Sequence, residues 1–283
     1  MWDTDATIVP TTRKLMISEN DLTLDNIGRR DFVLYQQRKG FRLGTDSVLL
    51  AWFAASFARK DNIGNYRRTS YLELGSGCGG ASMCLAARLP DCSIDCLEIM
   101  KSSYEVLLKN IDANNISDRV HGYNCDIRVL PDEIKQKKYD IVFLNPPFFV
   151  GEKGNKTNAE SSSEEKLAAR FEENGTLEDF IRVAKSRVIP SSGYIVMVMK
   201  ADRLTDIMSL MDDMNIRPVR LMNIHPMADR NASSILIAGR IGNSNSQLKI
   251  LPPLILNESA DDSLRLTERA VAIYEGEHKD CFI

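Results

Sequence analysis

Residues 70–89 carry the pattern that most constrains the fold of this chain. Residues 70–74 have the length and residue types of a buried strand, and they run directly into the glycine-rich turn 75–80. The small residues 81–89 that follow predict a helix. This succession leaves backbone N–H groups open to a bound ligand, because the glycines have no Cβ to block the approach. It predicts an open α/β sheet with a cofactor at the carboxyl end of the strand.

Acidic residues end the next two predicted strands. Glu98 closes the strand at 92–98, about twenty residues past the glycine turn, where a doubly wound fold places a carboxylate on the ribose hydroxyls of a nucleoside. Asp126 closes a third strand at 119–126 and has the chemistry to accept from the amine of an adenine. A solvated loop residue is the competing interpretation for Glu98, and a helix cap is the competing one for Asp126.

A proline-rich turn follows the apolar strand at 139–144. Its sequence is Asn145-Pro146-Pro147-Phe148-Phe149. Two consecutive prolines exclude a helix and further ladder pairing, and they leave carbonyl groups without an intramolecular donor. An amide, a free carbonyl and an aromatic face suit a flat molecule that carries an NH2 group, such as a nucleobase or an amide. An ordinary turn without a ligand is the competing interpretation.

The remaining segments alternate between the two regular structures. Helices are predicted at 101–114, 177–188 and 202–214, and strands at 193–199, 216–224 and 233–241. This alternation predicts one mostly parallel sheet with an antiparallel closing strand and helices on both faces. We therefore expect a single domain over residues 1–283, with a cofactor-binding and catalytic core at 70–241 and a tail at 242–283.

The amino-terminal part of the chain predicts a hairpin at 21–36 and an apolar helix at 47–58. Thr45 and Asp46 precede the helix and are candidates for its cap. Positive charge concentrates before residue 70, at Arg29, Arg30, Arg38, Lys39, Arg42, Arg59, Lys60, Arg67 and Arg68. The segment 151–165 is nearly devoid of apolar residues, which fits either a lid over a substrate or a tolerated insertion.

Composition restricts the classes of partner. The net charge of −3 gives no overall basic field, although a local basic patch can still contact phosphates. Six cysteines without a CxxC pair and only three histidines predict no zinc site. The first residues do not resemble a signal peptide, and the longest apolar stretch, 48–57, is too short to cross a bilayer. We expect a cytoplasmic protein.

The order and spacing of these motifs resemble the class I S-adenosylmethionine-dependent methyltransferases of the amino-methylating Asn-Pro-Pro-aromatic kind, over residues 70–240. The resemblance implies a Rossmann-like fold with a seven-stranded sheet. It implies that the loop from Gly75 to Gly79 holds the amino-acid part of the cofactor, Glu98 its ribose and Asp126 its adenine. The cofactor-binding residues expected on this basis are Thr45, Asp46, Glu73, Gly75, Gly77, Gly79, Glu98, Asp126 and Asn145.

A narrower resemblance covers nearly the whole chain. Residues 40–46, the Asn-Pro-Pro-Phe-Phe turn and the later residues 226–230 are similar to the bacterial adenine-N6 methyltransferases of a valine tRNA. That similarity implies that the side-chain oxygen of Asn145 and the carbonyl of Pro146 accept from the target amine, and that Phe148 stacks on an extruded base. Phenylalanine stands where tyrosine is commoner, so a hydroxyl hydrogen bond is lost. The substrate would then be tRNA, contacted through residues 29–68 and the loop 150–166.

Three alternatives remain at this point. The glutamine methyltransferases of release factors carry the same turn, because an amide NH2 poses the same problem as an adenine NH2. A guanine-N2 methyltransferase of ribosomal RNA is the second, and an inactive RNA-binding scaffold with this fold is the third. The tRNA interpretation is favoured because the Gly-Phe-Arg-Leu-Gly-Thr-Asp segment at 40–46 leaves no room for the helical domain that precedes the cofactor fold in the release-factor enzymes.

Overall fold

The computed structural model describes residues 18–27, 31–39, 42–59, 67–146, 175–242, 247–258 and 265–275. Its centre is a sheet in the strand order β10-β8-β9-β7-β6-β3-β4-β5, with β11 also paired to β8. The strands are β3 (Ser70–Leu74), β4 (Ser93–Glu98), β5 (Val120–Asn124), β6 (Ile141–Leu144), β7 (Tyr194–Lys200), β8 (Ile216–His225), β9 (Ser234–Ile241), β10 (Lys249–Ile250) and β11 (Leu254–Ile255). The predicted α/β class is confirmed.

The strand directions follow the prediction. Strands β7, β6, β3, β4 and β5 are parallel to one another, and β9 runs antiparallel to both β7 and β8. These strands are the seven that we expected. The residues after 242 add two further strands, β10 and β11, which pair in parallel with β8. Each of these strands has only two residues, which is too short for a periodic sequence pattern, so the sequence did not predict them.

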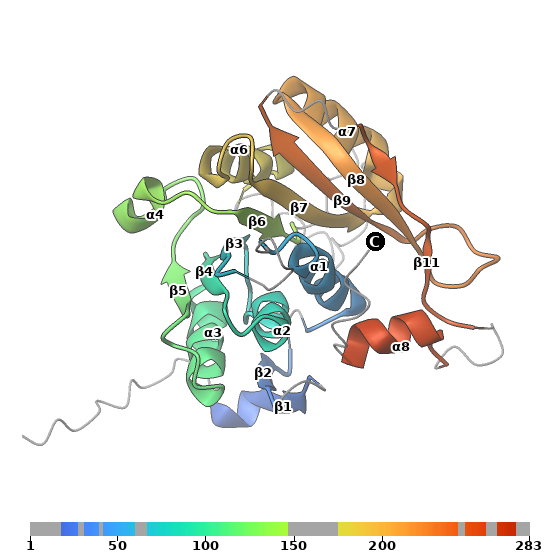
Figure 1. Ribbon diagram of the computed structural model, residues 1–283. Helices are drawn as coiled ribbons and strands as arrows, with labels where there is room; N and C mark the ends of the chain where they lie inside the picture. The colour runs from blue at the N-terminus through green and yellow to red at the C-terminus, as the bar shows by residue number, and fades with distance from the viewer. Residues whose placement is uncertain are drawn as a thin grey trace, which may run out of the picture.

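Helices cover both faces of the sheet (Figure 1). One apolar core lies between the sheet and α1 (Thr45–Ala55), α2 (Gly80–Arg88) and α3 (Lys101–Ala113), and α8 (Glu268–Glu275) packs beside α1. The other core lies under α4 (Asp132–Gln136), α6 (Leu177–Arg187) and α7 (Leu204–Asp213). Two short 3-10 helices, Glu19–Asp21 and Ala201–Arg203, complete the described elements.

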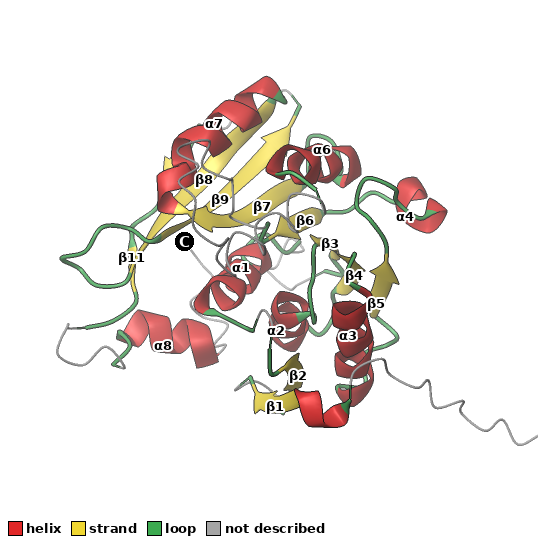
Figure 2. Ribbon diagram, turned by 180° about the vertical axis from the view of Figure 1, so that it is seen from behind, coloured by secondary structure: helices red, strands yellow, loops and turns green. Residues whose placement is uncertain are grey.

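The predicted hairpin is confirmed as a separate two-stranded sheet of β1 (Leu22–Asn26) and β2 (Val33–Gln37). It lies outside α2 and α3, as the view from behind shows (Figure 2). Two asparagines hold it, one in α3 and one directly after it: Asn110 exchanges hydrogen bonds with the backbone of Tyr35, and the C-cap residue Asn114 does the same with Val33. The two side-chain amides therefore make hydrogen bonds with the backbone of β2 that a neighbouring strand would otherwise make.

The predicted cap of the first apolar helix is wrong. Helix α1 begins at Thr45 rather than Ser47, its N-cap residue is Gly44, and no side chain caps its first N–H groups. Thr45 and Asp46 are therefore the first two helical residues, and their side chains are available for partners outside the helix. The helix ends at Ala55, three residues before the predicted end.

Candidate active site

The site lies where the strand order reverses. The chain leaves β3 for β4 and β5 on one side, and returns to β6 and β7 on the other side. Such a reversal opens a crevice at the carboxyl ends of the two central strands. Leu74 of β3 pairs with Leu144 of β6, so Gly75 and Asn145 are the next residues on adjacent strands. The glycine turn and the Asn-Pro turn therefore lie side by side.

Three glycines of the turn adopt left-handed backbone conformations. Their φ angles are 71° at Gly75, 57° at Gly77 and 85° at Gly79, a region that disfavours any side chain. A Cβ on Gly79 would lie 2.5 Å from Cδ1 of Leu107, whereas a Cβ on Gly77 would meet nothing within 4 Å. Gly79 is thus required by packing inside the protein. Gly77 is half-buried but has open space where a Cβ would lie, which fits the approach of a cofactor.

Glu98 lies at the end of β4 and is buried. Its two carboxylate oxygens accept from the backbone N–H groups of Gly77 and Met100, each at 2.7 Å. Burial raises the pKa of Glu98, against the lowering effect of these hydrogen bonds. The carboxylate braces the glycine turn and still has lone pairs for a ribose, since each oxygen offers two.

Glu73 occupies a different environment from the other acidic residues. It is buried one residue before the end of β3 and accepts a hydrogen bond from the Ser82 hydroxyl of α2, and burial raises its pKa to about 8. The same hydroxyl lies 3.1 Å from Sγ of Cys96. Glu73 therefore lies behind the glycine turn as a buried, largely protonated group, and its direct contact with the cofactor stays a prediction.

Asp126 follows β5 and does not cap a helix, because residues 127–129 form only a turn. Its carboxylate accepts from the backbone N–H of Arg128 at 2.8 Å and from the guanidinium at 2.6 Å. Hydrogen bonds from the Arg128 side chain lower the pKa of Asp126, so the group stays ionised. Asp126 therefore lies directly after β5 with Arg128 bound to its oxygens, and its contact with the adenine of a cofactor stays a prediction.

Asn145 has the most unusual hydrogen-bonding state in the site. Its side-chain oxygen Oδ1 is buried, and among the residues that the structure describes no donor reaches it. Buried polar atoms normally have a partner, because an unpaired one costs about 1–3 kcal/mol. Pro146 follows and is buried. Phe148, the predicted stacking residue, lies outside the described residues.

The side chains of Thr45 and Asp46 bind other elements. Thr45 Oγ1 accepts from the Tyr274 hydroxyl of α8 at 2.8 Å. Asp46 accepts from the buried Ser234 hydroxyl of β9 at 3.0 Å and lies 3.7 Å from Nζ of Lys200 at the end of β7. Sequence reasoning missed these three partners, because they lie far along the chain and no motif marks them.

The basic residues before position 70 lie in two separate places. Arg38 and Arg42 belong to the hairpin side, where Arg42 pairs with Asp25 at 2.8 Å. Arg59 pairs with Asp140, the residue before β6, so it lies at the amino end of the sheet. Arg29, Arg30, Lys60 and the loop 150–166 lie outside the described residues.

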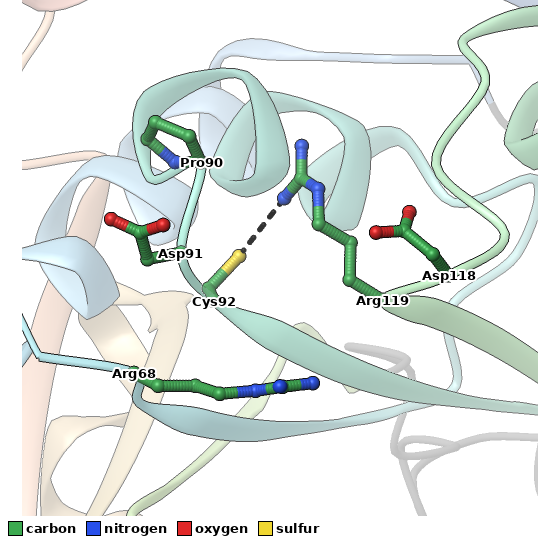
Figure 3. Close-up of a pocket in the computed structure, with 6 residues that line it drawn as sticks. All are labelled: Arg68, Pro90, Asp91, Cys92, Asp118 and Arg119. Atoms are coloured by element: carbon green, nitrogen blue, oxygen red, sulfur yellow. Dashed lines mark hydrogen bonds between the residues drawn. The ribbon is translucent and has the colours of Figure 1, made fainter.

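A cavity of about 300 Å³ lies at the amino ends of β3, β4 and β5. Figure 3 shows Arg68, Asp91, Asp118 and Arg119 around it, with a hydrogen bond from Arg119 to the thiol of Cys92. Its two arginines and two aspartates balance in charge, and it opens at the opposite edge from Asn145. The cavity is therefore separate from the candidate site.

Membrane spans and metal sites are both absent from the part of the chain that the structure describes. No described helix is long and apolar enough to cross a membrane. Within the same ranges, no group of three or more His, Cys, Asp or Glu side chains is arranged to hold a metal ion.

Comparison with known proteins gives consistent results. Residues 61–182 match the family model described as methyltransferase small domain. The tRNA1(Val) (adenine(37)-N6)-methyltransferase of Flavobacterium psychrophilum is 24% identical over 78% of this chain and 89% of its own length. The protein of the same name from Porphyromonas gingivalis W83 is 30% identical over 63% of this chain and 66% of its own.

Solved structures agree on the fold. A predicted O-methyltransferase of Agrobacterium tumefaciens, Atu636, has a TM-score of 0.61 and 21% identity, covering 82% of this chain and 96% of that one. The tRNA m1G37 methyltransferase of M. jannaschii has a TM-score of 0.54 and 14% identity, covering 79% of this chain and 58% of that one. The domain match and the relatives identify this chain as a methyltransferase, an enzyme whose methyl donor is S-adenosylmethionine, and the solved structures show that its fold is that of class I methyltransferases.

Proposed function

We propose that this enzyme methylates the exocyclic N6 amine of an adenine in tRNA, next to the anticodon. One observation carries the proposal: the buried Oδ1 of Asn145, which no donor reaches among the described residues. A buried oxygen beside the glycine turn that has no donor among the described residues is suited to accept a hydrogen bond from an incoming NH2 group. The names of the curated relatives favour a tRNA adenine as the source of that group.

In this proposal the residues of the chain position the target amine against the methyl group of the cofactor. Bound S-adenosylmethionine supplies an electrophilic methyl group. Asn145 Oδ1 and the carbonyl of Pro146 accept one hydrogen bond each from the target amine, which turns the nitrogen lone pair out of conjugation with the ring. Their fixed placement beside β3 orients that lone pair, so most of the rate enhancement comes from orientation and electrostatics. We assign the stacking of the extruded base to Phe148.

The cofactor contacts follow the order of the strands. Gly75, Gly77 and Gly79 would face its amino-acid part, Glu98 its ribose and Asp126 its adenine. The open space above Gly77 and the ionised state of Asp126 support this arrangement. Thr45 and Asp46 would close the site from the side of α1. We place the activity in the cytoplasm, where tRNA is modified.

One experiment tests the proposal and its alternatives together. The purified enzyme is incubated with methyl-labelled cofactor and, separately, with total tRNA, ribosomal RNA and a release factor, and the labelled material is digested. We expect the label in N6-methyladenosine from tRNA. Label in glutamine or in N2-methylguanosine would replace the proposal with one of the alternatives, and binding without transfer would indicate a scaffold.

A further inference from the structure

Five basic side chains extend from the amino edge of the sheet to the middle of β8, away from the strands that carry the candidate active site. They are Arg59 after α1, Arg217 and Arg220 on β8, Arg240 on β9 and Lys249 on β10. The strand register pairs Arg217 with Arg240 and Arg220 with Lys249, so the partners in each pair project from the same face. We call these five residues the amino-edge basic cluster.

Aromatic rings hold two of the guanidinium groups in place. The guanidinium of Arg220 lies 4.7 Å from the ring centre of Phe57, and that of Arg240 lies 5.0 Å from the ring centre of Tyr194. The two rings are themselves 4.5 Å apart, so both lie on the α1 face of the sheet. Arg240 also donates one N–H to the carbonyl of Ser191. These contacts fix the arginines before any ligand arrives, which lowers the entropy lost on binding.

The cluster is poor in compensating negative charge. Asp140 pairs with Arg59 at 3.2 Å. Within the described ranges, no carboxylate lies within 4.0 Å of the charged groups of Arg217, Arg220, Arg240 or Lys249. The whole chain carries a net charge of −3, so this local excess of positive charge is not a general property of the surface.

We propose that the amino-edge basic cluster binds phosphates of the RNA backbone, as a second contact region outside the active site. A guanidinium stacked on a ring presents its N–H edge to phosphate oxygens, and its planar fork matches them. Helix α1 has 11 residues and spans about 16 Å between the two edges of the sheet. A double-stranded RNA segment of about 16 base pairs, which a single RNA-binding module can span, is longer than that distance, so one RNA can contact both regions.

The RNA partner rests on the proposed function, whereas the geometry of the cluster does not. The test uses the double variant Arg217→Ala with Lys249→Ala, since both side chains are exposed and neither stacks on a ring. The matched control is Arg182→Ala with Lys135→Ala, which removes one arginine and one lysine from α6 and α4 on the other face. Thermal unfolding and cofactor affinity confirm that both proteins are folded.

We expect the cluster variant to bind tRNA about tenfold more weakly than the control at fixed salt. We also expect the slope of log K against log salt to shrink by about 0.7–0.9 for each phosphate that the variant no longer neutralises. Affinity and slope equal to those of the control would overturn the proposal. Weaker binding only to phosphatidylcholine vesicles containing one quarter phosphatidylglycerol, with tRNA affinity unchanged, would also overturn it and indicate a lipid surface.

The result is separable from a failure of the proposed function. If wild-type enzyme methylates tRNA and the cluster variant binds tRNA like the control, the cluster assignment alone is wrong. If wild-type enzyme leaves every tRNA adenine unmethylated but the cluster variant still loses RNA affinity, the substrate assignment alone is wrong.

Discussion

The two edges of the same sheet carry opposite chemistry. At the carboxyl edge, strand ends and helix starts present backbone N–H groups, three left-handed glycines and the oxygen of Asn145, which has no donor among the described residues. At the amino edge, basic side chains bind the carbonyl ends of helices. Arg119 donates to Ala86 and Leu89 at the end of α2, at 3.1 and 3.2 Å, and Arg187 donates to Ile134 in α4 at 3.1 Å.

The difference follows from chain direction. In a parallel α/β sheet every strand starts at one edge, and every connecting helix ends there. Helix ends carry partial negative charge from free carbonyls and attract cations, whereas helix starts attract electron-rich groups. The amino edge thus satisfies many of its polar groups internally. The carboxyl edge leaves donors and acceptors for a ligand.

Replacing Asn145 with Ala should give the largest effect and tests whether the carboxyl edge holds the chemistry. We expect methyl transfer to fall by about 10²–10³, since one fixed acceptor is removed, with cofactor affinity nearly unchanged. Single-turnover transfer and calorimetric titration measure the two quantities. Ser70→Ala, at the amino end of β3, is the control and should leave the rate intact. An active Asn145→Ala enzyme would remove the acceptor role.

Replacing Glu98 with Ala should raise the cofactor dissociation constant by about 100-fold, because it removes charge-assisted hydrogen bonds of about 1.5–3 kcal/mol. Glu98→Gln retains an acceptor and the size of the side chain, so we expect a smaller increase. Calorimetric titration of S-adenosylhomocysteine into each variant measures the effect. An unchanged constant in Glu98→Ala would exclude the ribose role.

Replacing Gly77 with Ala tests whether the cofactor approaches the backbone of the glycine turn at this residue. The new Cβ meets no protein atom but projects where the cofactor approaches, and a φ of 57° costs about 1–2 kcal/mol for a residue with a side chain. We expect about tenfold weaker cofactor binding in a folded protein. Gly44→Ala, which also meets nothing within 4 Å and has no left-handed φ, should bind normally. Equal affinity in the two variants would contradict the open approach at Gly77.

The buried carboxyl of Glu73 should affect stability rather than activity, and the effect depends on pH. Its pKa is about 8 in the folded protein against an ordinary value of 4.5, so between these values the unfolded chain releases a proton that the native state keeps. The free energy of unfolding should therefore fall as pH rises through this window, by at most about 1.4 kcal/mol per pH unit. Urea unfolding at pH 5, 6, 7 and 8 measures it. Glu73→Gln should lack this component, and parallel pH profiles of the two proteins would show that Glu73 titrates normally.

Much of the fold was predictable from local patterns. The strand, glycine turn and helix at 70–89, the acidic strand ends and the Asn-Pro turn are each contained in short segments, and their order predicted the sheet and the position of the crevice. The predicted cap at Thr45 and Asp46 was wrong because residue type alone does not show whether a side chain turns back to its own helix. Here other elements offer partners, and the side chains bind those instead.

The sequence by itself determined the enzyme class, because cofactor-binding turns and the buried strands around them depend on neighbouring residues. Tertiary structure alone decided which distant groups meet. It joined Thr45 to Tyr274 and Asp46 to Lys200 and Ser234, and it brought Arg59 to the same edge as the arginines of β8 and β9. Strand register and the reversal of strand order bring these distant residues into contact. Both depend on contacts between residues up to 229 positions apart, which leave no periodic trace in the chain.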